Sequence, residues 1–185
     1  MPETPRPALT RVAVLIPTYN EAENLPGVVE RVRSVTPEVD VVVLDDNSPD
    51  GTGEIADRLA AADEQVHVLH RPGKAGLGAA YLDGFQWAID RGYDAVVEMD
   101  ADGSHQPEHL PAMLAAAADA DLVIGSRWVR GGAIENWPLH RKALSVGGNV
   151  YTKVLLGMPV HDATAGYRVY RTAALQEIGL ADVAS

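Results

Sequence analysis

Short apolar runs alternate with longer segments of mixed polarity along most of the chain. The runs are rich in valine, and each is typical of a strand that is buried on both faces of a sheet. We expect such strands at residues 12–16, 39–44, 66–70, 94–99 and 121–126. The polar and apolar positions therefore predict a regular succession of strands, each followed by a helix.

The segments between the runs have helical periodicity. In the first of them, apolar residues recur at the i, i+3, i+4 and i+7 positions that form one face of a helix: Leu25, Val28, Val29 and Val32. Asn20 is the expected N-cap of this helix, with Glu23 as its capping-box partner. Further helices are expected over residues 54–62, from residue 77 onward and from residue 110 onward. After Gly131 the pattern weakens, and we expect a loop over 134–138, a helix near 141–156, a turn over 157–166 and a short strand at 167–171.

The connections between the five expected strands are too long for hairpins. This predicts an α/β protein with a mostly parallel central sheet and helices on both faces. In such sheets, ligands bind beyond the carboxyl ends of the strands. Four polar loops follow four of the strands: "PTYNE", "DDNSPDG", "DADGS" and "SRWVRGG". We expect them to converge on one crevice.

Two carboxylates, Asp100 and Asp102, stand one residue apart just after the fourth run. Paired aspartates in loops are more often turn formers, but the position of these two at a buried strand end favours a metal site. Hard carboxylate oxygens suit Mg²⁺ or Mn²⁺, and Mg²⁺ is usually held by one or two carboxylates and substrate phosphates. The pair therefore predicts a divalent site that a nucleotide diphosphate completes.

The glycine-rich stretch "GKAGLGAAY", residues 73–81, matches neither common phosphate-binding motif. A Walker loop needs Ser or Thr after the lysine, where this chain has Ala75. A dinucleotide fingerprint follows the first strand, whereas this stretch follows the third, and Tyr81 occupies the place of its last glycine. We expect these glycines to supply backbone freedom before a helix.

The composition of the chain argues against several classes of function and location. The chain has 185 residues, about one domain, and its net charge of -11 argues against a nucleic-acid binder. It has no cysteine, which excludes disulfides and thiolate sites. Residues 1–10 lack the apolar core of a signal peptide, and no run approaches the ~20 apolar residues of a membrane span. We expect a disordered arm over 1–10, a single domain over 11–185 and a cytoplasmic location.

Together, "PTYNE", "LDDNSPDGT", "GKAGLGAAY", "MDADGSHQPE", "GSRWVRGGAIENWPLHRKALS" and "DATAGYRVYR" resemble the dolichol-phosphate or polyprenol-phosphate mannose synthases. These are inverting glycosyltransferases of family 2 with the GT-A fold. The resemblance runs from Arg11 to about Gly179; its shorter motifs imply the fold and a nucleotide-sugar donor, and the longer ones a polyprenyl-phosphate acceptor. It implies metal-dependent transfer of mannose from GDP-mannose to a polyprenyl (dolichyl) phosphate, at the cytoplasmic face of a membrane, with a membrane protein as a possible partner.

The resemblance also implies roles for individual residues. The nucleotide-sugar site would comprise Pro17, Tyr19, Glu21, Leu44, Asp46, Asp100, Ala101, Asp102 and Arg127. Asp102 and Arg127 would be the catalytic residues, because the metal and Arg127 stabilise the leaving diphosphate. Arg141 and Ser145 would bind the acceptor phosphate, and the metal ligands would be Asp100 and Asp102. Ser104 stands where some members have a glutamine ligand, which leaves the third ligand open between a serine hydroxyl and water.

Some positions carry simpler interpretations. Glu21 is equally a first-turn acid of a helix, Asp45 is expected in an Asx-type turn, and His105 is expected to be solvated or to cap a helix. A motif of these enzymes is matched by Asp162, Gly166 and Arg168, to which we assign no role beyond shaping the acceptor side.

The implied reaction is a single in-line displacement at the anomeric carbon. The acceptor phosphate is already anionic near neutral pH, so no general base is needed. Family members continue beyond the position of Ser185, so a C-terminal segment is expected to be lacking here. Two alternatives stay open: a related transferase that uses UDP-glucose or another nucleotide sugar, and a non-catalytic nucleotide- or partner-binding module.

Overall fold

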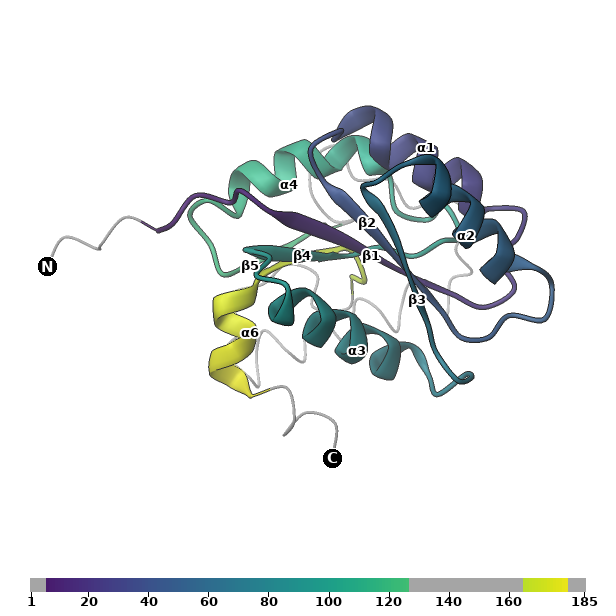
Figure 1. Cartoon of the computed structure of the whole chain (residues 1–185). Coiled ribbons are helices and arrows are strands. Elements are labelled where there is room, and N and C mark those ends of the chain that lie inside the picture. Colours follow the sequence, from purple (N-terminus) through teal and green to yellow (C-terminus); the bar gives the residue numbers. More distant parts are fainter. Residues whose placement is uncertain (1–5, 127–164, 180–185) are drawn as a thin grey trace, which may run out of the picture.

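The computed structural model describes residues 6–126 and 165–179 of the chain. Within them a six-stranded sheet has the order β3-β2-β1-β4-β6-β5 (Figure 1). The strands are β1 (Val12–Thr18), β2 (Asp40–Asp45), β3 (Val66–His70), β4 (Ala95–Glu98), β5 (Leu122–Ile124) and β6 (Arg168–Arg171). The helices are α1 (Leu25–Val35), α2 (Thr52–Ala62), α3 (Leu77–Asp90), α4 (Leu110–Ala116) and α6 (Thr172–Ile178), with a 3₁₀ turn, η1 (Pro107–His109), before α4.

The mostly parallel sheet is confirmed, but its fifth expected strand does not extend the parallel part. Strands β3, β2, β1 and β4 are parallel neighbours, and β5 lies outside this set. The returning strand β6 pairs antiparallel with both β4 and β5 and separates them. The short β5 therefore forms an edge of the sheet, and its residues are partly exposed rather than buried on both faces.

Helices cover both faces of the sheet, as expected (Figure 1). Alternate residues of β1 point to opposite faces, so that Val14 and Ile16 pack in one core with α1, α2 and α4. Ala13 and Leu15 pack in the other core with α3 and α6. On that second face α3 lies very close to the sheet at Gly84, where a Cβ atom would lie 2.9 Å from side-chain atoms of both Leu15 and Leu44.

The expected capping of α1 is wrong. The helix begins at Leu25, its N-cap is Asn24, and no side chain caps it. Asn20 has a φ of 62° and belongs to the preceding turn, in which the N–H groups of Asn24 and Leu25 donate to the carbonyl oxygen of Glu21. The helix therefore starts later than expected, and this turn lengthens the loop after β1.

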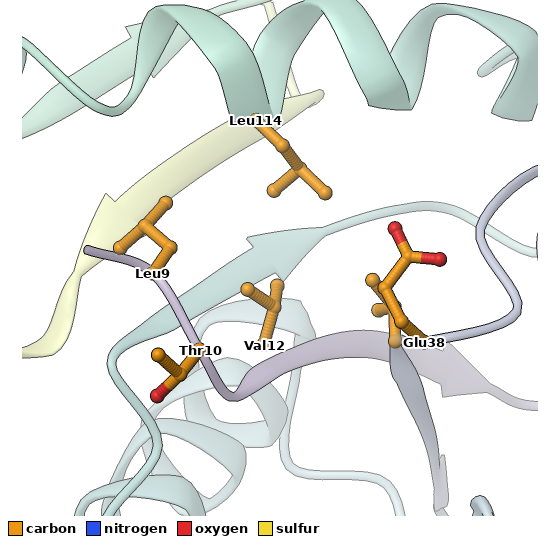
Figure 2. Close-up of a pocket in the computed structure, with 6 residues that line it drawn as sticks. Leu9, Thr10, Val12, Glu38 and Leu114 are labelled. Carbon is orange, nitrogen blue, oxygen red and sulfur yellow. The ribbon is translucent and has the colours of Figure 1, made fainter.

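At the amino-terminal edge of β1, the residues before the strand pack on the sheet. The carboxylate of Asp94 accepts hydrogen bonds from the N–H of Thr10 at 2.8 Å, from its hydroxyl at 2.7 Å and from the N–H of Arg11 at 2.9 Å. A cavity of about 170 Å³ lies beside them, lined by Leu9, Thr10, Val12, Glu38, Val39 and Leu114 (Figure 2). It lies at the opposite end of β1 from the polar loops.

Candidate functional site

The order of the sheet places a topological switch point between the carboxyl ends of β1 and β4, and we call the region beyond these two strand ends the crevice. The chain continues from β1 to β2 on one side and returns to β4 on the other, which is where ligands bind in open α/β sheets. Pairing of β1 with β4 ends at Leu15, whose carbonyl accepts from Met99. The backbone of Pro17, two residues further on, also faces β4, but proline has no N–H to donate, so the two strands separate there.

The loop after β1 places Tyr19 and Glu21 at the rim of this crevice. The Tyr19 side chain is 38% exposed, and the ammonium nitrogen of Lys74 lies 4.2 Å from the centre of its ring. Glu21 is held from both sides: its N–H donates to Thr52 Oγ1 at 3.0 Å, and its Oε2 accepts from Asn24 Nδ2 at 2.8 Å. Lys74 brings the glycine-rich loop before α3 to the same rim, a contribution not expected from the sequence.

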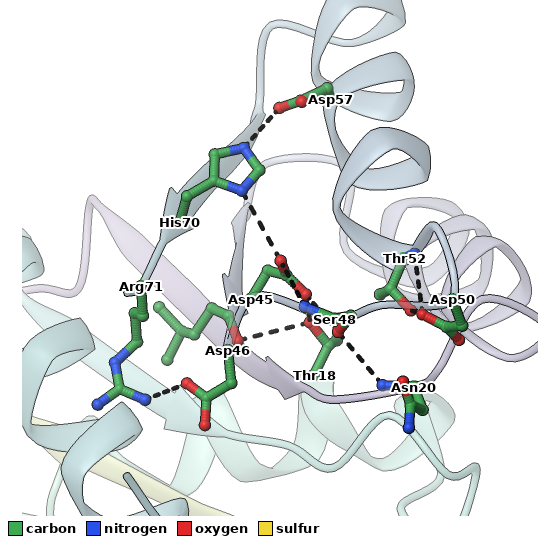
Figure 3. A network of polar contacts seen from close by, with 11 residues as sticks. Thr18, Asn20, Asp45, Asp46, Ser48, Asp50, Thr52, Asp57, His70 and Arg71 are labelled. Carbon is green, nitrogen blue, oxygen red and sulfur yellow. Dashed lines mark hydrogen bonds and ion pairs between the residues drawn. The ribbon is translucent and has the colours of Figure 1, made fainter. Parts of the chain in front are cut away.

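The loop after β2 is organised by the buried carboxylate of Asp45 (Figure 3). It accepts from the Ser48 hydroxyl at 2.6 Å and from the Ser48 N–H at 3.3 Å, three residues on rather than the two of an Asx-type turn, so the turn expected at Asp45 is wrong. The Asx-type contact before α2 is made by Asp50 instead, whose carboxylate accepts from the N–H and hydroxyl of Thr52, the first residue of that helix. His70 links this network to α2, with its ring nitrogens 3.8 Å from Asp45 and 2.9 Å from Asp57.

Asp46, expected at the nucleotide base, is buried and ion-paired with Arg71 (Figure 3). Arg71 comes directly after β3, and its Nε donates to Asp83 at 2.7 Å. Burial alone would lower the pKa of Arg71, but its hydrogen bonds to Asp83 and Asp46 outweigh burial and raise it. Arg71 was not expected at the site; its position directly after a strand, like that of the other polar loops, is the signal that could have predicted it.

Leu44 and Ala101, two other residues expected at the nucleotide, are fully or almost fully buried. The side chain of Leu44 is covered by α3 at Gly84. The burial includes the backbone, so the structure leaves Leu44 no exposed surface for a nucleotide and Ala101 almost none.

The loop after β4 carries Asp100 and Asp102 into the crevice. The side chain of Asp100 is 34% exposed, and its Oδ1 accepts from the Tyr81 hydroxyl at 3.3 Å. Asp102 Oδ1 accepts from the Ser104 N–H at 2.9 Å. Partial burial would raise the pKa of Asp102, but hydrogen bonds from Ser104 and the nearby His105 ring outweigh it and lower the pKa. Asp102 is thus an ionised carboxylate near neutral pH.

These two side chains fit a divalent cation by the chemistry of their donors. Both present hard carboxylate oxygens at a strand end, as Mg²⁺ and Mn²⁺ prefer. Within residues 6–126 and 165–179, no group of three or more His, Cys, Asp or Glu side chains is arranged to hold a metal. This part of the protein therefore supplies at most a pair of carboxylates, which leaves coordination positions open for phosphate oxygens.

A buried polar cluster lies beneath the pair. Glu98, the last residue of β4, lies 3.7 Å from Arg168 and 3.5 Å from the Tyr170 hydroxyl, both on β6. Burial raises the pKa of Glu98 to about 7, against the opposing effect of Arg168. This cluster was not predictable from local patterns, because it arises from the unexpected pairing of β6 with β4.

Four residues of the expected site lie outside the described residues: Arg127, Arg141, Ser145 and Asp162. Gly166 and Arg168, from the motif without an assigned role, are described. Gly166 lies against Asp100 and His105, and Arg168 lies against Glu98. The structure therefore brings together the loops after β1, β2, β3 and β4 with the segment that precedes β6.

Comparison with known proteins gives a consistent result along the chain. The model of Glycosyl transferase family 2 matches residues 13–179. The chain is 57% identical to the polyprenol monophosphomannose synthase of Mycolicibacterium smegmatis, in a match that covers 100% of this chain and 70% of the relative. It is 58% identical to the undecaprenyl-phosphate mannosyltransferase of Micrococcus luteus, over 92% of this chain and 70% of the relative.

Solved structures with the same arrangement of elements include the mannosyltransferase from Pyrobaculum calidifontis in complex with GDP-mannose and Mn²⁺. That match has a TM-score of 0.61 at 20% identity and covers 94% of this chain and 49% of the other. Glucosyl-3-phosphoglycerate synthase from Mycobacterium tuberculosis, in complex with Mn²⁺, UDP and its product, matches with a TM-score of 0.62 at 20% identity, over 90% and 58% of the two chains. At these identities the likeness shows the fold, which is the expected GT-A type.

Proposed function

This chain belongs to glycosyl transferase family 2 and is a glycosyltransferase, and from this premise we propose that it transfers mannose from GDP-mannose to the phosphate of a polyprenyl phosphate. The observation that carries the proposal is the 57% identity, over the whole of this chain, to a polyprenol monophosphomannose synthase. The crevice between β1 and β4 is the proposed site, because four polar loops reach it.

On the donor side, we assign the nucleoside to the space between Tyr19 and Asp46. The exposed ring of Tyr19 offers a stacking surface for a base or ribose. The carboxylate of Asp46 is an acceptor that Arg71 holds in place, and a guanine base presents N–H donors to such an acceptor. Pro17 and Glu21 shape the rim, and Leu44 and Ala101 support the site from within the fold. Lys74, which lies over the Tyr19 ring, is the proposed positive charge for the diphosphate.

Asp100 and Asp102 are the residues that would hold Mg²⁺ or Mn²⁺, with Ser104 or water as a further donor. When bound, the ion neutralises the charge that grows on the leaving diphosphate. Arg127 would assist in the same role. The carboxylate pair orients the donor so that the anomeric carbon faces the acceptor.

On the acceptor side, Arg141 and Ser145 are the proposed phosphate ligands. Two anions, the acceptor phosphate and the donor diphosphate, must approach each other, and cationic side chains offset their repulsion. The attacking phosphate oxygen carries its own negative charge, so the mechanism requires positioning rather than proton removal. The product is β-linked from an α-linked donor.

A lipid acceptor requires that the enzyme meet a membrane surface. No helix in the described part of the chain has the length and apolar character to cross a bilayer. We propose a peripheral encounter at the cytoplasmic leaflet, with a membrane protein as a possible partner.

The direct test is product formation from labelled GDP-mannose and a short-chain polyprenyl phosphate in the presence of Mn²⁺. Replacing Asp102 with asparagine should reduce the rate at least a hundredfold, since a charged ligand of the diphosphate-bound ion is lost. Asp119→Asn is the matched control, because Asp119 is an exposed aspartate just beyond α4, and this variant should keep the full rate. Equal rates of the wild-type chain and the Asp102 variant would refute the metal assignment.

The same purified protein can distinguish the proposed function from the two alternatives, a related transferase and a non-catalytic module. Thermal shifts with GDP, GDP-mannose, UDP and UDP-glucose in Mn²⁺ distinguish donors, because a ligand stabilises the folded state according to its affinity. Stabilisation by the uridine nucleotides alone would point to the related glucosyltransferase. Nucleotide binding without any sugar transfer would point to a non-catalytic module.

A further inference from the structure

The carboxylate of Asp100 is contacted from behind by two segments that are far apart in the sequence. One is the loop after β4, which places His105 against it. The other is the pair Gly166 and Tyr167, just before β6.

The first contact fixes the backbone of Asp100. Its N–H donates to Nδ1 of His105 at 3.0 Å. Because Nδ1 is the acceptor, a neutral imidazole ring carries its proton on Nε2. Nε2 lies 3.7 Å from Asp100 Oδ2, so the protonated side of the ring faces the carboxylate. One ring thus interacts with both the backbone and the side chain of the same aspartate.

The second set of contacts fixes the ring of His105. It stacks on Tyr167 with a centroid distance of 5.1 Å and an interplanar angle of 12°. Tyr167 is itself held by its carbonyl oxygen, which accepts from the N–H of Gly125 at 2.8 Å. At residue 166 a Cβ atom would lie 3.3 Å from Cε1 of His105 and 3.6 Å from Asp100 Oδ2, so glycine lets the backbone close behind both groups.

The other carboxylate oxygen is also held. Tyr81, from α3, donates its hydroxyl hydrogen to Asp100 Oδ1 at 3.3 Å. Neither oxygen therefore depends on water alone for its orientation. A side chain that is fixed before its ligand arrives loses less conformational freedom on binding.

We infer that His105, backed by Gly166 and Tyr167, is a positioning residue that holds Asp100 in the orientation needed to bind a divalent cation. The inference rests on the proposed function, which assigns the cation to Asp100 and Asp102. It also gives a role to residues 166 and 167, in a motif that the resemblance left without one. Groups that orient metal ligands in this way commonly change metal affinity by 10–100-fold when they are replaced.

The test measures Mn²⁺ binding in the presence of GDP, from the electron paramagnetic resonance signal of free Mn²⁺. His105→Ala should weaken Mn²⁺ binding about 10-fold or more. His105→Gln should recover part of the loss, because its amide oxygen can accept from the Asp100 N–H. His109→Ala is the matched control, since His109 is an exposed histidine four residues further on, and it should bind Mn²⁺ as the wild-type chain does.

A second measurement separates positioning from general damage. GDP binding in EDTA does not use the metal, so it should stay within about twofold of wild type in both His105 variants. Tyr167→Phe should also keep Mn²⁺ affinity, because the ring that supports His105 is retained.

Unchanged Mn²⁺ affinity in His105→Ala would overturn the inference. So would an equal loss of GDP binding with and without metal, because that result indicates a misfolded site. A wild-type chain that binds no Mn²⁺ with GDP or with UDP would refute the metal assignment in the proposed function, and the positioning role with it. The wild-type titration therefore tells the two failures apart.

Discussion

Replacing Arg71 with methionine should destabilise the protein strongly, because it leaves a carboxylate buried without its cation. The side chains of Arg71 and Asp46 are only 6% and 9% exposed. Removing one partner of such a pair costs about 3–5 kcal/mol, whereas exposed pairs contribute about 0–1 kcal/mol. Asp83, the other partner of Arg71, is 56% exposed, so its contribution falls in the second class.

These magnitudes predict an order among variants that urea unfolding can measure. Arg71→Met should lower the free energy of unfolding by roughly 3–5 kcal/mol, and Asp83→Asn by about 1 kcal/mol or less. Combining Arg71→Met with Asp46→Asn removes the stranded charge and should be milder than Arg71→Met alone. Fluorescence and circular dichroism should give coincident transitions if one cooperative unit unfolds.

Two results would refute this reasoning. One is an Arg71→Met variant that is no less stable than Asp83→Asn, which would mean that the buried pair contributes nothing beyond a surface pair. The other is a double variant as unstable as Arg71→Met, which would assign the loss to packing of the arginine side chain rather than to the charge of Asp46.

Three further predictions follow from other positions. Burial raises the pKa of Glu98 from 4.5 to about 7, so between these pH values the folded protein holds a proton that the unfolded chain has released. The free energy of unfolding should therefore fall by on the order of 3 kcal/mol as pH rises through this range. Glu98→Gln should flatten this pH dependence when urea unfolding is measured at pH 5 and pH 8 in EDTA, and an unchanged dependence would contradict the assignment. Gly84→Ala should cost about 1–3 kcal/mol because its methyl group meets two leucine side chains, whereas Gly78→Ala, with no atom within 4 Å, should be neutral or slightly stabilising. Lys74→Ala removes a positive charge at the rim and should weaken GDP binding about threefold to tenfold and reduce the salt dependence of binding. Lys74→Arg keeps the charge and should leave both quantities unchanged, as calorimetry at two salt concentrations can check.

The sequence predicts the parallel half of this fold well for a physical reason. Strands buried on both faces must be apolar throughout, and their intervening helices must be amphipathic, so both patterns are visible locally. The run at 66–70 matches β3 at both ends. The place of β6 between β4 and β5 was not predictable in the same way, because pairing between distant strands leaves no local pattern in either one.

The residues of the candidate site fall into the same two groups, those with a local signal in the sequence and those defined by distant partners. The position of Asp100 and Asp102 at the end of a buried strand could be predicted because they directly follow an apolar run, and their role in binding a metal stays a prediction. Arg71 could have been placed at this edge of the sheet because it directly follows a strand, but its pairing with Asp46 and the contact of His105 with Asp100 arise only in three dimensions. His105 was expected to be solvated or to cap a helix; its side chain is only 14% exposed, and it accepts from the Asp100 N–H.

The hairpin-like pairing of β5 with β6 has a consequence for how this enzyme class can diversify. The hydrogen bond from Gly125 to Tyr167 joins the two ends of residues 127–164 beside the crevice. The entropy cost of closing a connection between two neighbouring points grows only slowly with its length. The pairing of β5 with β6 is therefore compatible with connections of different lengths between Gly125 and Tyr167, while the strands around Asp100 keep their register.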